Sequence, residues 1–334
     1  RSRGYTIADH RADNLVIIFR GDITNYFYIF GGKDERSQDL IQGITLAGVF
    51  FDEVALMPES FVNQATGRCS VDGSKYWFNC NPDGPYHWFK TGWIDKREEK
   101  HLLYLHFTMD DNLSLSEKIK ERYRSMYTGV FYRRYILGLW AMAEGIIYDM
   151  FDTAKHVISN LSELTNANYY VSCDYGTQNA TVFLLWCKDR LGRWVCCREY
   201  YYSGRDEERQ KTDTEYADDL EQWLDGIKPV KIVIDPSAAS FIAELKKRGY
   251  AIKKAKNDVL DGIRFVASLL NQGKIAISDQ CPNTIKEFGS YIWDQKASER
   301  GEDKPVKQHD HAMDALRYFC YTIIRKPGSI SILK

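Results

Sequence analysis

The sequence predicts an α/β protein of two domains joined by a connector, and three observations support this class. Short β-prone runs that end in an acid occur in both halves of the chain, at Asp52-Glu53, Asp174 and Asp235. In the second half, three β-prone runs follow one another through short turns, which predicts an antiparallel meander. Apolar residues at helical spacing separate the later runs, which predicts helices that flank a mixed sheet of antiparallel and parallel strands.

Composition favours a globular protein with no membrane span. The 334 residues allow two cores of ordinary size. No run approaches the roughly 18 apolar residues of a membrane helix, and we expect no membrane partner. Eight cysteines occur without a CxxC pair, which argues against a zinc site. Their pattern favours a protein of the reducing cytoplasm. The formal net charge of −1 argues against a uniformly basic nucleic-acid binder but leaves room for local basic patches.

The first domain is predicted to span residues 1–128. Runs 15–19 and 26–30 predict a β-hairpin, and residues 46–51 form a continuous apolar strand, which we expect to be central and covered on both faces. Asp52-Glu53 ends this strand. A helix over 59–65 and a strand over 75–80 follow, the latter ending in Asn79-Cys80-Asn81-Pro82, and a further helix is predicted over residues 117–126. Taken alone, the acid pair is also compatible with a solvated loop.

Residues 129–166 are predicted to be a connector. Its aromatic, glycine-punctuated run over 138–152 indicates an apolar strap. The arginines in and before the connector either lie on a solvent-exposed helix face or contact DNA phosphates. They are Arg122, Arg124, Arg133 and Arg134.

The second domain is predicted over residues 167–334, with strands over 169–173, 180–187 and 193–202. A helix over 214–224 precedes a buried strand over 231–234. Because a helix separates the third and fourth strands, the fourth is expected to cross over and lie parallel to the first. This places Asp174 and Asp235 side by side at the carboxyl ends of neighbouring strands, where ligand sites of α/β sheets lie. Later elements are helices near 241–245 and 259–270, a strand over 274–277, an amphipathic stretch over 284–293 and a last helix from 308.

The last helix carries His311 and Asp314 three residues apart, beside its apolar stripe. Together with Asp174 and Asp235 they are predicted to form a site for two Mg²⁺ or Mn²⁺ ions, about 4 Å apart, of the kind that cleaves phosphodiesters. Carboxylates suit these ions, and one histidine favours Mn²⁺. An acid that ends a strand is more often a turn former, so the prediction depends on all of these side chains converging. The order of strands and helices is that of the ribonuclease H-like fold.

The first domain resembles the second half of the ATPase domain of phage terminase large subunits, on the strength of Asp52-Glu53 and the Asn79 to Pro82 tip. The resemblance implies a P-loop-type ATP site in which Asp52 holds Mg²⁺ through water, Glu53 activates the attacking water and Asn81 couples hydrolysis to movement. The chain contains no GxxxxGK[ST] phosphate loop and begins without Met. We therefore expect the amino-terminal part of the motor to be missing, and this chain to neither bind nor hydrolyse ATP appreciably.

The second domain resembles the terminase nuclease at three motifs, residues 173–176, 234–237 and 310–318. Several family members have Asp-Asp where this chain has Asp310-His311, so the last ligand is His311, Asp314 or Asp310, with the first two preferred. The resemblance implies an endonuclease that cuts concatemeric double-stranded DNA during packaging in the host cytoplasm. It also implies a small terminase subunit and a portal protein as partners, and oligomerisation only on the procapsid.

A lysine-rich stretch follows Asp235 and offers contacts to DNA phosphates, although a solvated surface is an equal alternative. Its lysines are Lys246, Lys247, Lys253, Lys254 and Lys256. No base-reading module is recognisable, so cleavage is expected to be largely independent of sequence. Two other functions stay open: a catalytically inactive prophage remnant that keeps DNA or portal contacts, and a resolvase or transposase of the same fold, which the motor-like motifs disfavour.

Overall fold

The computed structural model describes residues 4–32, 34–161, 164, 168–176 and 179–325. The chain forms two compact units, Arg1–Asn81 with Gly92–Lys96 and Pro82–Thr91 with Arg97–Lys334. The predicted domain boundaries near residues 128 and 166 do not coincide with this division. Residues 82–91, directly after the Asn79 to Asn81 tip, already belong to the second unit.

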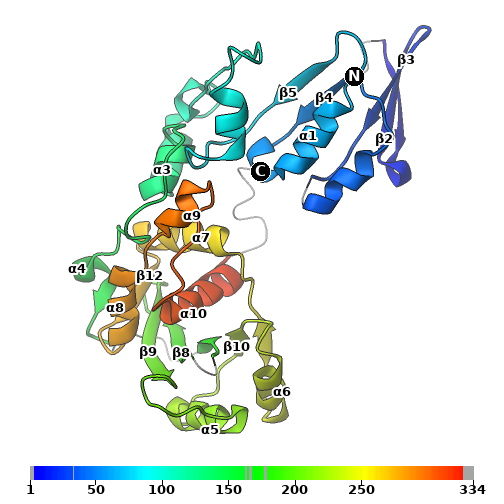
Figure 1. The fold of residues 1–334 in the computed structure, drawn as a ribbon. Coiled ribbons are helices and arrows are strands. Elements are labelled where there is room, and N and C mark those ends of the chain that lie inside the picture. The colour runs from blue at the N-terminus through cyan, green and yellow to red at the C-terminus, as the bar shows by residue number, and fades with distance from the viewer. Residues whose placement is uncertain (1–3, 33, 162–163, 165–167, 177–178, 326–334) are drawn as a thin grey trace. The chain divides into compact units, whose positions relative to one another are not determined.

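The first unit begins with an antiparallel meander of β1 (Thr6–His10), β2 (Leu15–Arg20) and β3 (Ile23–Tyr28) (Figure 1). The predicted hairpin is confirmed, with a tighter turn than expected, because Arg20 already pairs with Ile23. Gly21 adopts φ +57° in this two-residue turn, a conformation that glycine adopts without strain. Strand β1 was not predicted, since it has only Ile7 and Ala8 as apolar residues and is mostly exposed.

A β-α-β unit follows, made of β4 (Gly48–Phe51), α1 (Glu59–Gly67) and β5 (Lys75–Phe78). The two strands are parallel and form a sheet of their own among the described residues. The expectation that β4 is central and covered on both faces is wrong here, because β4 has β5 as its neighbour in a two-stranded sheet. Phe50 accordingly remains 60% exposed, whereas Phe51 is buried and stacks on Phe78.

The second unit includes short helices before its sheet, α2 (Glu117–Arg124), α3 (Gly129–Tyr135) and α4 (Thr153–His156). Arg134 of α3 is buried and forms ion pairs with Asp83 and Asp303, so it supports the fold and is not available to solvent. The strap over 138–152 contributes Ile147 and Tyr148 to the main core of this unit.

A mixed sheet organises the second unit, with the order β11-β10-β7-β8-β9-β12-β6 among the described residues. Strands β7, β8 and β9 form the predicted antiparallel meander, and β10 lies parallel to β7, as the predicted crossover requires. Strands β11, β12 and β6 extend the sheet in parallel. The bounds are β6 Val157–Ile158, β7 Tyr170–Asp174, β8 Ala180–Lys188, β9 Trp194–Ser203, β10 Lys231–Ile234, β11 Ile252–Lys254 and β12 Ile275–Ser278.

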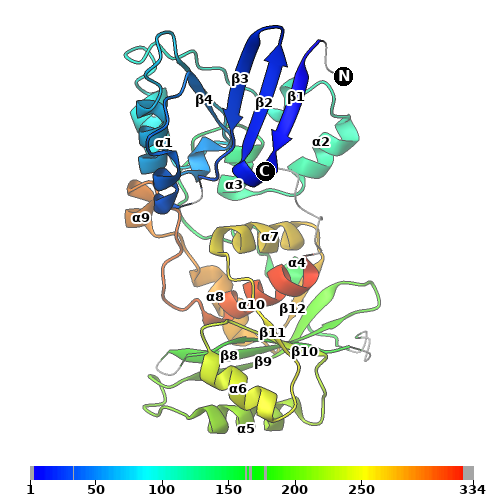
Figure 2. The same cartoon turned by 90° about the vertical axis from the view of Figure 1, so that its right-hand side faces the viewer.

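Helices cover both faces of this sheet, as Figure 2 shows. Helices α5 (Asp213–Leu224) and α6 (Ala239–Lys247) pack on one face, and α7 (Val259–Asn271), α8 (Pro282–Ser290) and α10 (His311–Phe319) on the other. Strand β8 is buried on both sides because successive side chains alternate between the two cores. Val182, Leu184 and Trp186 face α10, while Phe183, Leu185 and Cys187 face α5 and α6. Helix α9 (Gln295–Glu299) precedes α10.

All eight cysteines are free, and most of them are buried. Cys173 shows their role: it is fully buried in β7, and burial raises the pKa of its thiol well above the usual value. These thiols therefore act as small apolar side chains, as their positions in apolar runs predicted. Within the described residues, no helix combines the length and apolar character needed to cross a membrane.

Candidate functional site

Asp174 and Asp235 end neighbouring parallel strands. Cys173 of β7 pairs with Ile234 of β10, so the two acids are the next residues along the two strands at the same edge of the sheet. Pro236 follows Asp235 and ends the strand, since proline lacks the N–H that a ladder needs. The predicted placement of these two acids is thus confirmed at the level of the sheet register.

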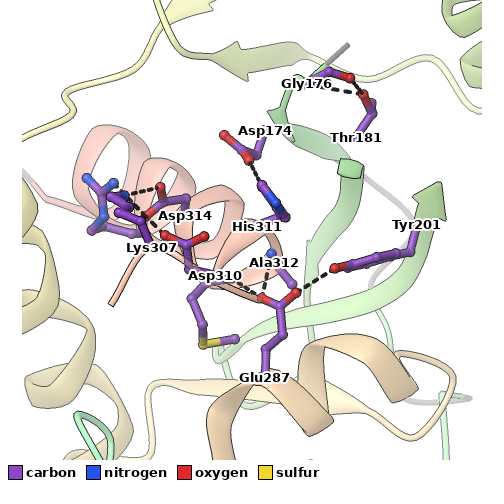
Figure 3. Close-up of polar contacts among 12 residues, drawn as sticks. Asp174, Gly176, Thr181, Tyr201, Glu287, Lys307, Asp310, His311, Ala312 and Asp314 are labelled. Carbon is purple, nitrogen blue, oxygen red and sulfur yellow. Dashed lines mark hydrogen bonds and ion pairs between the residues drawn. The ribbon is translucent and has the colours of Figure 1, made fainter. Parts of the chain in front are cut away.

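Helix α10 packs across β7 and β8 and brings His311 to Asp174. Nδ1 of His311 lies 2.9 Å from Oδ2 of Asp174 (Figure 3). Burial raises the pKa of Asp174 to about 6, although the hydrogen bond from His311 opposes this shift. Burial lowers the pKa of His311, but the hydrogen bond and charge of Asp174 outweigh it, and the net shift is upward. His311 and Asp174 therefore each favour the charged form of the other, against the burial that opposes both.

Asp310 and Asp314 lie at the start of α10 and share one cation. The Lys307 ammonium lies 3.1 Å from Oδ2 of Asp310 and 3.2 Å from Oδ2 of Asp314 (Figure 3). Oδ1 of Asp314 accepts a hydrogen bond of 2.8 Å from buried Arg317. Oδ2 of Asp310 is buried, and Lys307 is its ionic partner among the described residues.

A chain of hydrogen bonds joins Asp314 to Asp235. Arg317, held by Asp314, donates from Nη1 to the carbonyl oxygen of Asn257 (3.0 Å), and Asn257 donates from Nδ2 to Oδ2 of Asp235 (3.2 Å). The backbone N–H of Ser237 also donates to Asp235 at 2.7 Å. Burial raises the pKa of Asp235, but these bonds outweigh it and the net shift is downward. Sequence reasoning missed Asn257, because a lone Asn in a loop carries no signal.

The charges of all three predicted carboxylates act on Tyr318 of α10. Burial raises the pKa of its hydroxyl, and so do the charges of Asp174, Asp314 and Asp235. Tyr318 stands inside the motif over 310–318, but no role was predicted for it from the sequence.

Glu287 of α8 is a buried acid that sequence reasoning did not place in the site. Its Oε2 accepts hydrogen bonds from the backbone N–H groups of Ala312 (2.8 Å) and Met313 (3.1 Å), and its Oε1 accepts one from Tyr201 (2.9 Å) (Figure 3). Burial raises its pKa to about 7, despite the opposing effect of these hydrogen bonds. An acid within an amphipathic helix usually lies on the solvated face, which is why the pattern alone did not indicate this role.

The site has the ligand atoms of a metal centre, but they are not arranged for coordination. Its carboxylate oxygens and single imidazole are ligands that Mg²⁺ and Mn²⁺ accept. The Lys307 ammonium already occupies a position between Asp310 and Asp314, which shows that a cation is accommodated there. Within the described part of the chain, no three His, Cys, Asp or Glu side chains gather closely enough to hold an ion. The residues fit the ions in kind, and their side chains must come closer together to coordinate one.

The predicted lysine patch divides into two parts. Lys254 of β11 pairs with Ile234 of β10, which directly precedes Asp235. Lys253 and Lys256 are close to Lys254 in the chain, so these three lysines lie at the acidic edge, the edge of the sheet that carries Asp174 and Asp235. Lys246 and Lys247 end α6, which runs back from that edge before β11 returns to it. All five side chains are exposed.

Asn79 holds the two acids of the first unit through its side chain. Asn79 donates from Nδ2 to Oδ1 of Asp52 (2.9 Å), and its Oδ1 accepts the backbone N–H of Glu53 (2.7 Å). Glu53 adopts φ 59°, a strained conformation for a side-chain-bearing residue. Burial raises the pKa of Glu53, and the Asp52 charge adds to this shift. The polar tip of β5 therefore contacts the acid pair that follows β4 through Asn79, and the coupling role of Asn81 stays a prediction.

Comparison with known proteins gives matches in both halves of the chain. The family model "Terminase large subunit, T4likevirus-type, N-terminal" matches residues 4–155, and "Terminase RNaseH-like domain" matches residues 194–321. The large terminase subunit of Escherichia phage T5 is 25% identical over 296 residues, a match that covers 83% of this chain and 65% of that protein. The chain therefore spans less than two thirds of that relative's length.

Solved structures of the large terminase from a thermophilic bacteriophage are more similar. Its complex with ADP is 62% identical with a TM-score of 0.87, and the match covers 97% of this chain and 81% of that chain. A second crystal form is 63% identical with a TM-score of 0.88, covering 97% and 80%. These matches agree with the observed order of an ATPase-like part followed by a ribonuclease H-like sheet. The chain belongs to the large terminase family of bacteriophages.

Proposed function

We propose that the second unit is a divalent-metal-dependent endonuclease that cuts concatemeric double-stranded DNA during genome packaging. One observation carries the proposal: Asp174 and Asp235 end adjacent parallel strands while α10 brings His311 to within hydrogen-bond distance of Asp174. Burying several acids together costs free energy unless cations neutralise them. In the structure His311, Lys307 and Arg317 supply this positive charge, and divalent ions would take over part of the role when bound.

The proposed ligands are Asp174, Asp235 and Asp314, with His311 supporting Asp174 and serving as a further ligand. A pair of Mg²⁺ or Mn²⁺ ions would supply water activation and neutralise charge on the leaving oxygen. Asp235 is suited to its role because its lowered pKa keeps it ionised at neutral pH. Arg317 orients Asp314 through their hydrogen bond. Lys307 must release Asp314 when an ion binds.

The first unit is proposed to act within an ATP-driven translocation domain. Asp52 would hold Mg²⁺ of ATP and Glu53 would activate water, and Asn81 is kept as the predicted coupling residue beside Asn79. The relative from the thermophilic bacteriophage is described in complexes with ADP and with ATP-γ-S, which supports nucleotide binding by the family. The proposed partners are double-stranded DNA, a small terminase subunit and the portal protein, and the proposed location is the host cytoplasm.

Nicking of supercoiled plasmid in Mn²⁺ tests the nuclease proposal. The purified chain is expected to convert supercoiled to open-circular and linear DNA, and EDTA is expected to stop the reaction. Asp174→Asn and Asp235→Asn each remove a charged oxygen without changing shape and are expected to abolish nicking. A folded wild-type chain without metal-dependent nicking would support the inactive-remnant alternative instead.

A further inference from the structure

The helix that carries the site begins without a cap of its own. Asp310 occupies the N-cap position of α10, but its side chain makes no capping hydrogen bond and contacts Lys307 instead. The first N–H groups of any helix lack partners inside the helix, and leaving them buried and unpaired is unfavourable. An external acceptor is therefore required.

Glu287 supplies that acceptor from a different helix. Its Oε2 binds the N–H groups of Ala312 and Met313, which lie between His311 and Asp314 in the chain. Glu287 thus fixes the turn of backbone from which both predicted ligands project (Figure 3). Because Glu287 provides the cap, Asp310 does not have to, and its carboxylate stays beside Asp314.

Helix α8 is in turn fixed to the sheet at two points. Glu199 of β9 caps its N-terminus, where it accepts the backbone N–H of Asn283 (2.8 Å) and of Thr284 (2.9 Å). Tyr201, two residues along the same strand, donates to Glu287. The position of α10 therefore depends on β9 through two successive carboxylate caps.

We propose that Glu287 is a positioning residue for the metal centre, which sets His311 and Asp314 relative to Asp174 without touching the ions. This inference rests on the proposed metal-dependent function. Groups that orient metal ligands typically change metal affinity by about 10–100-fold when removed, because ligands must be held within about 0.5 Å of their working positions. Loss of Glu287 is expected to weaken Mn²⁺ binding by that factor.

The test is Mn²⁺ binding to the full chain without DNA, measured from the EPR signal of free Mn²⁺. Glu287→Ala removes the cap. Glu287→Gln keeps it, because the amide oxygen can accept both N–H groups while the amide nitrogen donates to the Tyr201 hydroxyl oxygen. Glu215→Ala is the matched control, since Glu215 forms the capping box of α5 with Thr212, and α5 packs on the opposite face of the sheet. Circular dichroism selects a temperature at which all variants are folded.

Glu287→Ala is expected to raise the Mn²⁺ dissociation constant about 10–100-fold, whereas Glu287→Gln and Glu215→Ala stay within about threefold of wild type. Wild-type Mn²⁺ affinity in folded Glu287→Ala would overturn the inference, as would equal weakening in Glu215→Ala. If Glu287→Ala does not fold, a 10-fold or greater loss of Mn²⁺ affinity in Glu287→Gln also contradicts the inference. A wild-type chain that binds no Mn²⁺ contradicts the proposed function itself, so the two failures are distinguishable.

Discussion

Oδ2 of Asp174 and Nδ1 of His311 lie 2.9 Å apart, although 137 residues separate them in the chain. This contact connects the end of the first strand of the meander to the first residue of the last helix. Both side chains are mostly buried, so the contact persists in a partly desolvated environment where charges interact strongly. This contact thereby holds the end of β7 and the start of α10 together in one site.

Breaking this pair should impair the proposed nuclease to two different degrees. Asp174→Asn removes a proposed ligand and is expected to eliminate plasmid nicking in Mn²⁺. His311→Ala leaves Asp174 in place but unsupported, and is expected to lower the nicking rate at least about 10–100-fold. Asp218→Asn, which alters an exposed acid of α5 that pairs with Arg248, is the control and should keep the wild-type rate. Normal nicking by Asp174→Asn would rule out its role.

The raised pKa of Glu287 predicts that stability falls as pH rises. The folded state holds a proton on Glu287 up to about pH 7, whereas the unfolded chain releases it near 4.5. The folded state therefore binds more protons between these values, and the free energy of unfolding decreases across this window. Glu287→Gln removes this contribution, on the order of 3 kcal/mol between pH 4.5 and 8.

Urea denaturation of wild type and Glu287→Gln at pH 5 and pH 8 measures the difference. Asp174, whose pKa is also raised, contributes equally to both proteins and cancels. Identical pH dependence of the two proteins would show that Glu287 is not protonated in the folded state.

Asn79 should hold the loop between β4 and α1. Asn79→Ala removes the hydrogen bonds to the Asp52 carboxylate and to the Glu53 amide, and is expected to cost about 1 kcal/mol of local stability. Hydrogen exchange at the Glu53 amide is the measurement, and its protection should be lost. Asn81→Ala is the matched control, and should leave that amide protected. Equal loss of protection in both variants would mean that Asn79 has no special role.

The two parts of the lysine patch should differ in DNA binding. Lys254→Ala with Lys256→Ala removes two charges at the acidic edge and should reduce the slope of log affinity against log salt by about 2. Lys246→Ala with Lys247→Ala removes the same charge from the end of α6 and should change the slope by less than half as much. Fluorescence anisotropy with a double-stranded oligonucleotide in EDTA gives both slopes. Equal slopes for the two double variants would contradict this placement of DNA.

Much of the second unit could be predicted from local pattern. The meander and the crossover followed from β-prone runs, short turns and helical spacing, and the pairing of β7 with β10 placed Asp174 beside Asp235 as expected. Such features depend on neighbouring residues and on chain connectivity, which a sequence displays directly.

What the sequence did not reveal depends on contacts between distant segments. Glu287 reaches α10 from a separate helix, and Asn257 reaches Asp235 from a loop, so neither lies in a recognisable motif. Asn79 likewise reaches Asp52 from a strand end 27 residues away in the chain, and no separate role was predicted for it. The expected burial of β4 assumed neighbours on both sides, which its apolar run cannot specify.

Crystals soaked in Mn²⁺ offer the most direct test of the central claim, that acids from two strand ends and the last helix bind a shared pair of cations. Anomalous difference maps should show Mn²⁺ bonded to carboxylate oxygens of Asp174 and Asp235, with His311 or an acid of α10 completing the shell and Lys307 displaced. Maps without a peak at this edge of the sheet, or with Mn²⁺ bound only elsewhere, would contradict the account.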